Sequence, residues 1–262
     1  MKQLILFFSL AYLLSWVIWL PLYGQVFGLP ALPVLPFHHG IGSLGPLLAA
    51  FITTYLVEGF NGVRQLVKRC VTIQPIRYLL VALFSPFILV MLSVLLNFLV
   101  NDTSPRIGDL FHTPEFPEFT FIQFFIVNLL FYGFGEETGW RGFALPRVQM
   151  HVSPFLAALV MSVFWAIWHW PLFFYRPGMM SMNGAAVAGW FMSLLTGSIL
   201  LTWLYNKSKG SLFICAVFHS TIDIAFLADS ADQHIVNYLG ALITLWGIWT
   251  GIRMVKSERA ND

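Results

Sequence analysis

The stretch from Phe131 to Gly142 places three charged side chains in an otherwise apolar part of the sequence. In a helix, Glu137 and Arg141 are four residues apart and share a face, so they can neutralise each other. Glu136 is turned about 100° away from Glu137 and has no local partner. A carboxylate held among apolar groups without a counter-ion is suited to take or give a proton. We therefore expect Glu136 to act as a general base or acid.

Two further polar motifs lie in apolar segments downstream. His169 follows an aromatic run, and Pro171 is expected to end or kink its helix just beyond the histidine. His219 and Asp223 are four residues apart and share a helical face. Because a charge inside a membrane span costs roughly 2.5 to 3.5 kcal/mol on insertion scales, we expect both motifs to converge on one site with the charged stretch around Glu136.

The composition is that of a membrane protein. Of 262 residues, 58% are hydrophobic and only 10% are charged, whereas soluble domains carry about 25% charged residues. The net charge is +2, and no basic cluster is interleaved with aromatic residues, so a nucleic-acid partner is not expected. Cys70 and Cys215 are far apart, which argues against a disulfide framework or a cysteine metal site. The sequence predicts an all-α polytopic protein in which residues 1–262 form a single integral membrane domain.

Eight segments have the length and apolarity of a membrane span. They cover residues 3–22, 41–58, 77–100, 119–138, 153–174, 184–205, 211–228 and 234–254. We expect a bundle of about eight transmembrane helices, with a catalytic core at about 119–228. If the N-terminus is cytoplasmic, twelve Lys and Arg residues fall on the cytoplasmic side and two, Arg106 and Arg176, on the other. This bias predicts a multi-pass protein of the cell membrane with both termini in the cytoplasm.

A helical hairpin relates Glu136 to His169. We expect the chain to remain helical through Gln149 and to turn near residue 152, which lies sixteen residues after Glu136 and seventeen before His169. The two side chains should therefore lie at about the same level. His219 is closer to its own cytoplasmic loop than Glu136 is to this turn. If the two side chains meet at one site, the hairpin must protrude from the membrane, or a helix must tilt or break. The sequence leaves this choice open.

Five other histidines fall in predicted loops, where we expect them to be solvated. They are His38, His39, His112, His151 and His234.

Three motifs together resemble the CPBP intramembrane protease family, which includes CAAX prenyl endoproteases and bacteriocin-processing or immunity proteins and is also described as the Abi family. The motifs are Glu136-Glu137-xxx-Arg141, His169 after its aromatic run, and His219-xxx-Asp223. The resemblance covers residues 119–228. The family commonly has Phe four residues before the second-motif histidine, where this chain has Trp165, and it allows Asn or Asp at the last position of the third motif.

The resemblance implies an intramembrane endopeptidase. Glu136, helped by His169, would activate a water for attack on a peptide carbonyl, while His219 and Asp223 would stabilise the oxyanion. The ion pair next to Glu136 would position it. The implied substrate is a membrane-anchored protein or peptide, prenylated, otherwise lipidated or amphipathic, cleaved near the cytoplasmic half of the bilayer.

The residues leave three alternatives open. In the first, His169, His219 and Asp223 bind zinc and Glu136 acts on the metal-bound water, although no HExxH motif is present. In the second, a non-catalytic scaffold or immunity protein binds a peptide toxin in the same cavity. In the third, the polar residues form the proton relay of a transporter, although broken spans duplicated in two halves are not seen. Each motif taken alone could also serve only to join helices.

Overall fold

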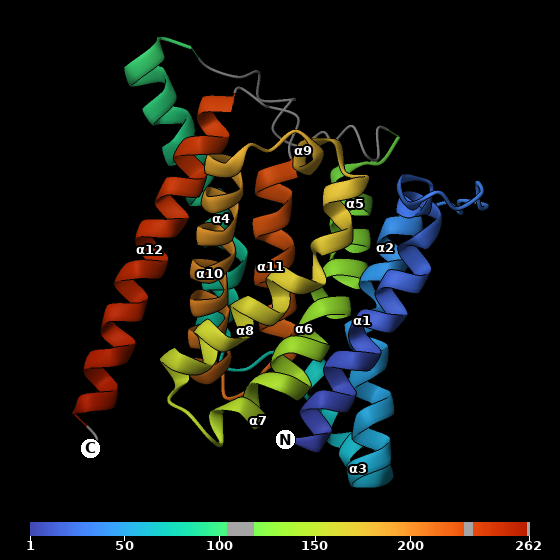
Figure 1. Cartoon of the computed structure of the whole chain (residues 1–262). Helices are drawn as coiled ribbons and strands as arrows, with labels where there is room; N and C mark the ends of the chain where they lie inside the picture. The colour runs from blue at the N-terminus through green and yellow to red at the C-terminus, as the bar shows by residue number, and fades with distance from the viewer. Residues whose placement is uncertain (104–117, 228–232, 261–262) are drawn as a thin grey trace.

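The computed structural model describes residues 1–103, 118–227 and 233–260. These residues form helices and no strand (Figure 1), which confirms the predicted all-α fold. Arg106 and His112, which the sequence predicts to lie in a loop, are outside the described residues.

Within the described part of the chain, six segments are long and apolar enough to cross a membrane. They are Lys2–Phe27, His38–Cys70, Ile76–Asn101, Pro154–Phe174, Gly184–Lys207 and His234–Arg259. Their main helices are α1 (Lys2–Tyr23), α3 (Gly45–Cys70), α4 (Ile76–Asn101), α8 (Pro154–Trp168), α10 (Gly184–Lys207) and α12 (Gln233–Arg259). The polytopic helical bundle is as predicted, but the count of eight is not confirmed. The seventh predicted span is the shorter apolar helix α11 (Leu212–Leu227).

The fourth predicted span is a helical run whose hydrogen-bond pattern changes along its length. Its successive pieces are α5 (Phe121–Asn128), the π-helical η3 (Leu129–Phe134), α6 (Gly135–Gly139), the π-helical η4 (Trp140–Ala144) and α7 (Leu145–Gln149). Thr120 starts the run with a capping box to Gln123. Short π-helical turns inside α-helices are rare and frequently mark functional sites. Here they flank the five-residue helix that carries both glutamates.

Helices pack closely on both sides of this segment because it is rich in glycine. A Cβ atom on Gly139 would lie 2.6 Å from the backbone oxygen of Pro46 in α3. On the opposite side, a Cβ atom on Gly133 would lie 2.6 Å from the backbone oxygen of Ala216 in α11. The glutamate-bearing segment is therefore held between α3 and α11 with no room for larger residues at these two positions.

The hairpin after the glutamates turns at residues 150–153, where Ser153 caps α8 and Pro154 takes its first position. Figure 1 shows α8 crossing the bundle obliquely, whereas α4, α10 and α11 stand upright. Of the arrangements that the sequence leaves open, the structure has a tilted α8 and a partner helix divided by π-helical turns.

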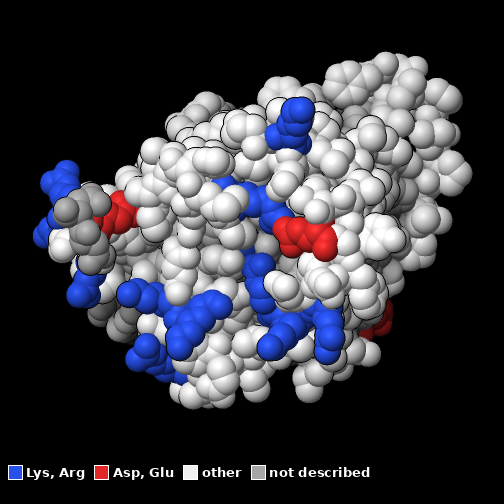
Figure 2. All heavy atoms as spheres, turned by 90° about the horizontal axis from the view of Figure 1, so that it is seen from below, with Lys and Arg blue, Asp and Glu red and all other residues white. Residues whose placement is uncertain are grey.

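Both termini lie at the same end of the molecule (Figure 1). Figure 2 shows that Lys and Arg side chains gather on the face at this end. Nine exposed residues belong to the set predicted for the cytoplasmic side, namely Lys2, Arg64, Lys68, Arg77, Lys207, Lys209, Arg253, Lys256 and Arg259.

Candidate active site

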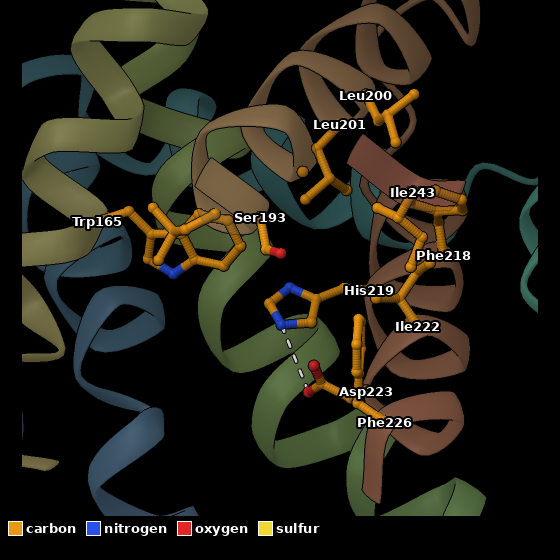
Figure 3. Close-up of a pocket in the computed structure, with 12 residues that line it drawn as sticks. Trp165, Ser193, Leu200, Leu201, Phe218, His219, Ile222, Asp223, Phe226 and Ile243 are labelled. Atoms are coloured by element: carbon orange, nitrogen blue, oxygen red, sulfur yellow. Dashed lines mark ion pairs between the residues drawn. The ribbon is translucent and has the colours of Figure 1, made fainter. Parts of the chain in front are cut away.

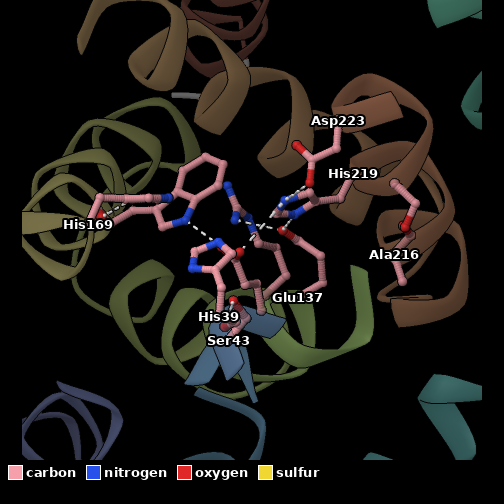
Figure 4. Close-up of polar contacts among 11 residues, drawn as sticks. His39, Ser43, Glu137, His169, Ala216, His219 and Asp223 are labelled. Atoms are coloured by element: carbon pink, nitrogen blue, oxygen red, sulfur yellow. Dashed lines mark hydrogen bonds and ion pairs between the residues drawn. The ribbon is translucent and has the colours of Figure 1, made fainter. Parts of the chain in front are cut away.

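Glu137 lies at the centre of a buried ionic network. Arg141 donates from its NH1 atom to Oε1 of Glu137 at 3.0 Å, and Nδ1 of His219 lies 2.7 Å from the same oxygen (Figure 4). The exposed fractions are 0% for Glu137, 1% for Arg141 and 6% for His219. The predicted pairing of Glu137 with Arg141 is confirmed. The same carboxylate also joins α6 to α11, which the spacing alone does not predict.

His219 presents its other nitrogen to two further carboxylates. A carboxylate only accepts hydrogen bonds, so Nδ1 of His219 carries the proton that it shares with Glu137. Nε2 then lies 3.5 Å from Oδ2 of Asp223 and 4.0 Å from Oε1 of Glu136. The predicted proximity of His219 and Asp223 on one helical face is confirmed, and the two residues meet the glutamate pair as predicted.

Glu136 is held by one of its two carboxylate oxygens. Oε2 accepts a hydrogen bond of 2.7 Å from the indole nitrogen of Trp165. Oε1 makes no hydrogen bond within the described part of the chain and faces Nε2 of His219. Glu136 is 4% exposed. The carboxylate predicted to lack a local partner therefore has a partner on α8, and one oxygen remains available for chemistry.

A mostly apolar cavity of about 80 Å³ borders this cluster. Its wall includes Trp165, Phe218, His219, Asp223 and Phe226. Figure 3 shows the imidazole of His219 between Trp165 and Asp223. The side chain of Asp223 is 32% exposed, whereas that of His219 is 6% exposed, so the polar cluster opens to the cavity on its Asp223 side. The cavity can accept an apolar group next to the cluster.

His169 lies one helical turn after Trp165, the residue that bonds to Glu136. Its Nδ1 is 2.7 Å from the backbone oxygen of Trp165, and its ring lies 5.6 Å from the Trp165 ring between centroids. It makes no hydrogen bond or ion pair with the other five predicted site residues in the described structure. A π-helical turn holds more residues than an α-helical one and so advances less per residue. The sixteen residues between Glu136 and the turn therefore span less length than a regular helix would, and it is Trp165 that bonds to Glu136. The end of α8 just before Pro171 is as predicted.

The prediction that His38 and His39 are solvated loop residues is wrong. Both lie in the short helix α2 (His38–Ser43). His38 is 8% exposed and accepts a 2.9 Å hydrogen bond from the backbone of Leu35. Nδ1 of His39 is 2.6 Å from the hydroxyl of Tyr175. A six-residue helix after a proline-rich loop has too few turns to show a helical pattern in the sequence. His151 is exposed as predicted, and His234 is exposed but belongs to α12.

Of the three residues considered as zinc ligands, His219 and Asp223 are in contact, and His169 makes no hydrogen bond or ion pair with either of them in the described part of the chain. Among the described residues, no group of three or more His, Cys, Asp or Glu side chains is arranged to hold a metal ion. The Trp165 ring packs against both imidazoles, with centroid distances of 5.6 Å to His169 and 5.6 Å to His219. Nδ1 of His169 is taken up by a backbone oxygen.

The fold and the site define a polytopic helical membrane protein in which a glutamate, an ion pair and a histidine form one buried centre. Residues 118–225 match the family model described as type II CAAX prenyl endopeptidase Rce1-like. The chain is also 32% identical over 108 residues to CAAX prenyl protease 2 of Methanococcus maripaludis, over 39% of this chain and 40% of that protein. The match thus spans about two fifths of the relative's length. These findings confirm the resemblance to the CPBP family over residues 118–225, which hold all six predicted site residues.

Proposed function

We propose that this protein is an intramembrane endopeptidase in which Glu136 is the general base. The observation that carries the proposal is the state of the two adjacent glutamates. Glu137 is neutralised by Arg141 at 3.0 Å, while Glu136 is buried, fixed through Oε2 and unbonded at Oε1. A buried carboxylate with one unbonded oxygen facing a histidine has the form of a base for water activation.

In the proposed reaction, a water molecule lies between Oε1 of Glu136 and Nε2 of His219, atoms that are 4.0 Å apart and too distant for a direct hydrogen bond. Glu136 takes a proton from the water as its oxygen bonds to the peptide carbonyl carbon. His219, protonated on both ring nitrogens and held in place by Glu137 and Asp223, donates from Nε2 to the oxyanion of the tetrahedral intermediate. The carbon–nitrogen bond then breaks, and the proton held by Glu136 passes to the leaving amine. His169 assists from its position beside Trp165, as the family resemblance implies.

The proposed substrate is a membrane-associated protein or peptide with an apolar or lipidated segment at the cleavage site. Two observations support it. The cavity beside His219 and Asp223 is lined mostly by apolar side chains. The relative from Methanococcus maripaludis is named for a CAAX prenyl protease activity, so a prenylated peptide is the first substrate to test. We also propose that the face bearing both termini and the gathered basic side chains is cytoplasmic, in keeping with the positive-inside rule.

The test is cleavage of fluorogenic peptides, prenylated and unprenylated, by the purified protein in detergent, with and without a chelator. We compare the wild type with Glu136→Gln, which keeps the size and the hydrogen-bond acceptor but cannot take the proton. Glu58→Gln is the matched control, because Glu58 is an exposed glutamate paired with Arg147 outside the site. Loss of a general base lowers a rate by about 10² to 10⁴-fold, so we expect a loss in this range for Glu136→Gln and none for Glu58→Gln.

Three results would contradict the proposal. Undiminished cleavage by Glu136→Gln would show that Glu136 is not the general base. Loss of activity on chelation would favour the metal-dependent alternative. A wild type that binds peptides as tightly as Glu136→Gln does, and cleaves none of them, would favour a binding scaffold or immunity protein.

A further inference from the structure

Trp165 lines the cavity and also contacts three residues of the charged centre. Its indole nitrogen donates to Oε2 of Glu136 at 2.7 Å. The guanidinium carbon of Arg141 lies 4.8 Å from the centroid of its ring, within the range of a cation–π interaction. The imidazole of His219 packs edge-on against the same ring at 5.6 Å. One side chain therefore touches the proposed base and both partners of Glu137.

The hydrogen bond determines which way the carboxylate of Glu136 is turned. The terminal torsion of a glutamate is broad, so the carboxylate rotates unless it is held. With Oε2 bound to the indole, Oε1 faces Nε2 of His219 across 4.0 Å. Without the indole N–H group, the carboxylate is free to rotate and close on His219 as a direct ion pair. That closure would fill the space that the proposed water occupies.

The hydrogen bond to Glu136 depends on residue 165 being a tryptophan. The family that the three motifs resemble commonly has Phe at this position, and Phe has no N–H group to donate. Trp165→Phe is therefore the substitution that tests the bond. The substitution then removes the hydrogen-bond donor while keeping an aromatic ring against Arg141 and His219.

We infer that Trp165 is a positioning residue that holds Glu136 through its indole N–H group and keeps Oε1 available as the base. This inference rests on the proposed function. Because the hydrogen bond orients the base without contacting the substrate, its loss lowers kcat and leaves KM nearly unchanged.

The test compares Trp165→Phe with Trp168→Phe in the peptide cleavage assay. Trp168 is the matched control, because it lies on the same helix, is 1% exposed and donates its indole N–H group to Ser15 at 2.8 Å. Removing a residue that orients a reacting group typically costs about 10 to 100-fold in activity. We expect Trp165→Phe to lower kcat by about 10 to 100-fold with KM within about threefold, and Trp168→Phe to change kcat by less than about twofold.

The outcomes separate this inference from the proposed function. Suppose that the wild type cleaves, that Glu136→Gln is inactive, and that Trp165→Phe and Trp168→Phe have the same kcat. In that case the positioning role is wrong, and the proposed function stands. A raised KM at unchanged kcat in Trp165→Phe would likewise overturn it, since that result is expected of a cavity wall. If Glu136→Gln remains active, the proposed function itself fails.

A stability measurement tests the hydrogen bond without relying on cleavage. In a double-mutant cycle, Glu136→Ala and Trp165→Phe each remove the same bond, so the double variant loses it only once. We expect the fall in Tm of the double variant to be smaller than the sum of the two single falls. The cycle of Ser15→Ala with Trp168→Phe calibrates the method on a second indole bond of this helix. Additive effects at Glu136 and Trp165, with coupling at Ser15 and Trp168, would overturn the inference.

Discussion

Removing Arg141 tests whether Glu137 is a structural carboxylate. Glu137 and Arg141 are 0% and 1% exposed, with 3.0 Å between Oε1 and NH1. Breaking a buried pair by removing one partner costs about 3 to 5 kcal/mol, because an uncompensated charge stays buried. His219 still contacts Oε1 of Glu137 at 2.7 Å, so we expect Arg141→Met to lower the free energy of unfolding by about 3 kcal/mol, at the lower end of that range.

The assay is denaturant or thermal unfolding in detergent, with Arg147→Met as the control. Arg147 pairs with Glu58 and also donates to the backbone oxygen of Phe143, and the side chains of Arg147 and Glu58 are 14% and 43% exposed. A partly exposed pair of this kind contributes about 0 to 1 kcal/mol. Replacing both members of a buried pair is often close to neutral, so the double variant Glu137→Gln with Arg141→Met should be more stable than Arg141→Met alone. Equal losses in Arg141→Met and Arg147→Met, or a double variant less stable than Arg141→Met, would refute a structural ion pair.

Two further predictions concern packing and the histidine network. Gly139→Ala should cost about 1 to 3 kcal/mol in unfolding free energy, because its Cβ would meet the backbone of Pro46. Gly189→Ala, also helical but with nothing within 4 Å of a Cβ, should be neutral or stabilising by up to about 1 kcal/mol; equal losses would contradict close helix packing. Asp223→Asn should keep kcat/KM within about tenfold if Asp223 only orients His219 through a hydrogen bond, and a loss above a hundredfold would show that its charge is required.

The local parts of the site could be predicted from the sequence because they depend on helical spacing. Glu137 with Arg141, and His219 with Asp223, are pairs four residues apart, and each lies in contact in the structure. Their convergence follows from the cost of charges in lipid, which the chain reduces by bringing polar groups together. The length and apolarity of the runs likewise predict the helical bundle.

The contacts between helices could not be predicted in the same way. Glu136 and Trp165 are separated by 29 residues, and their shared level depends on how far each intervening residue advances along the helix. Hydrophobic periodicity does not distinguish an i→i+5 turn from an i→i+4 turn over so few residues, so the π-helical η3 and η4 are not visible in the sequence. The turn η3 also divides the segment 119–138, which a count based on composition treats as one regular span.

The roles proposed for the two adjacent glutamates follow from where the helix between η3 and η4 directs them. Neighbouring residues of a helix point about 100° apart, so α6 directs the two carboxylates at different hydrogen-bond partners, although both lie near His219. Glu137 reaches His219 on α11 and Arg141 in its own segment, and Glu136 reaches Trp165 on α8. Because α3 packs directly on Gly139 and α11 on Gly133, the segment cannot rotate to exchange these partners. One carboxylate is therefore neutralised, and the other is left with a single hydrogen bond and one available oxygen.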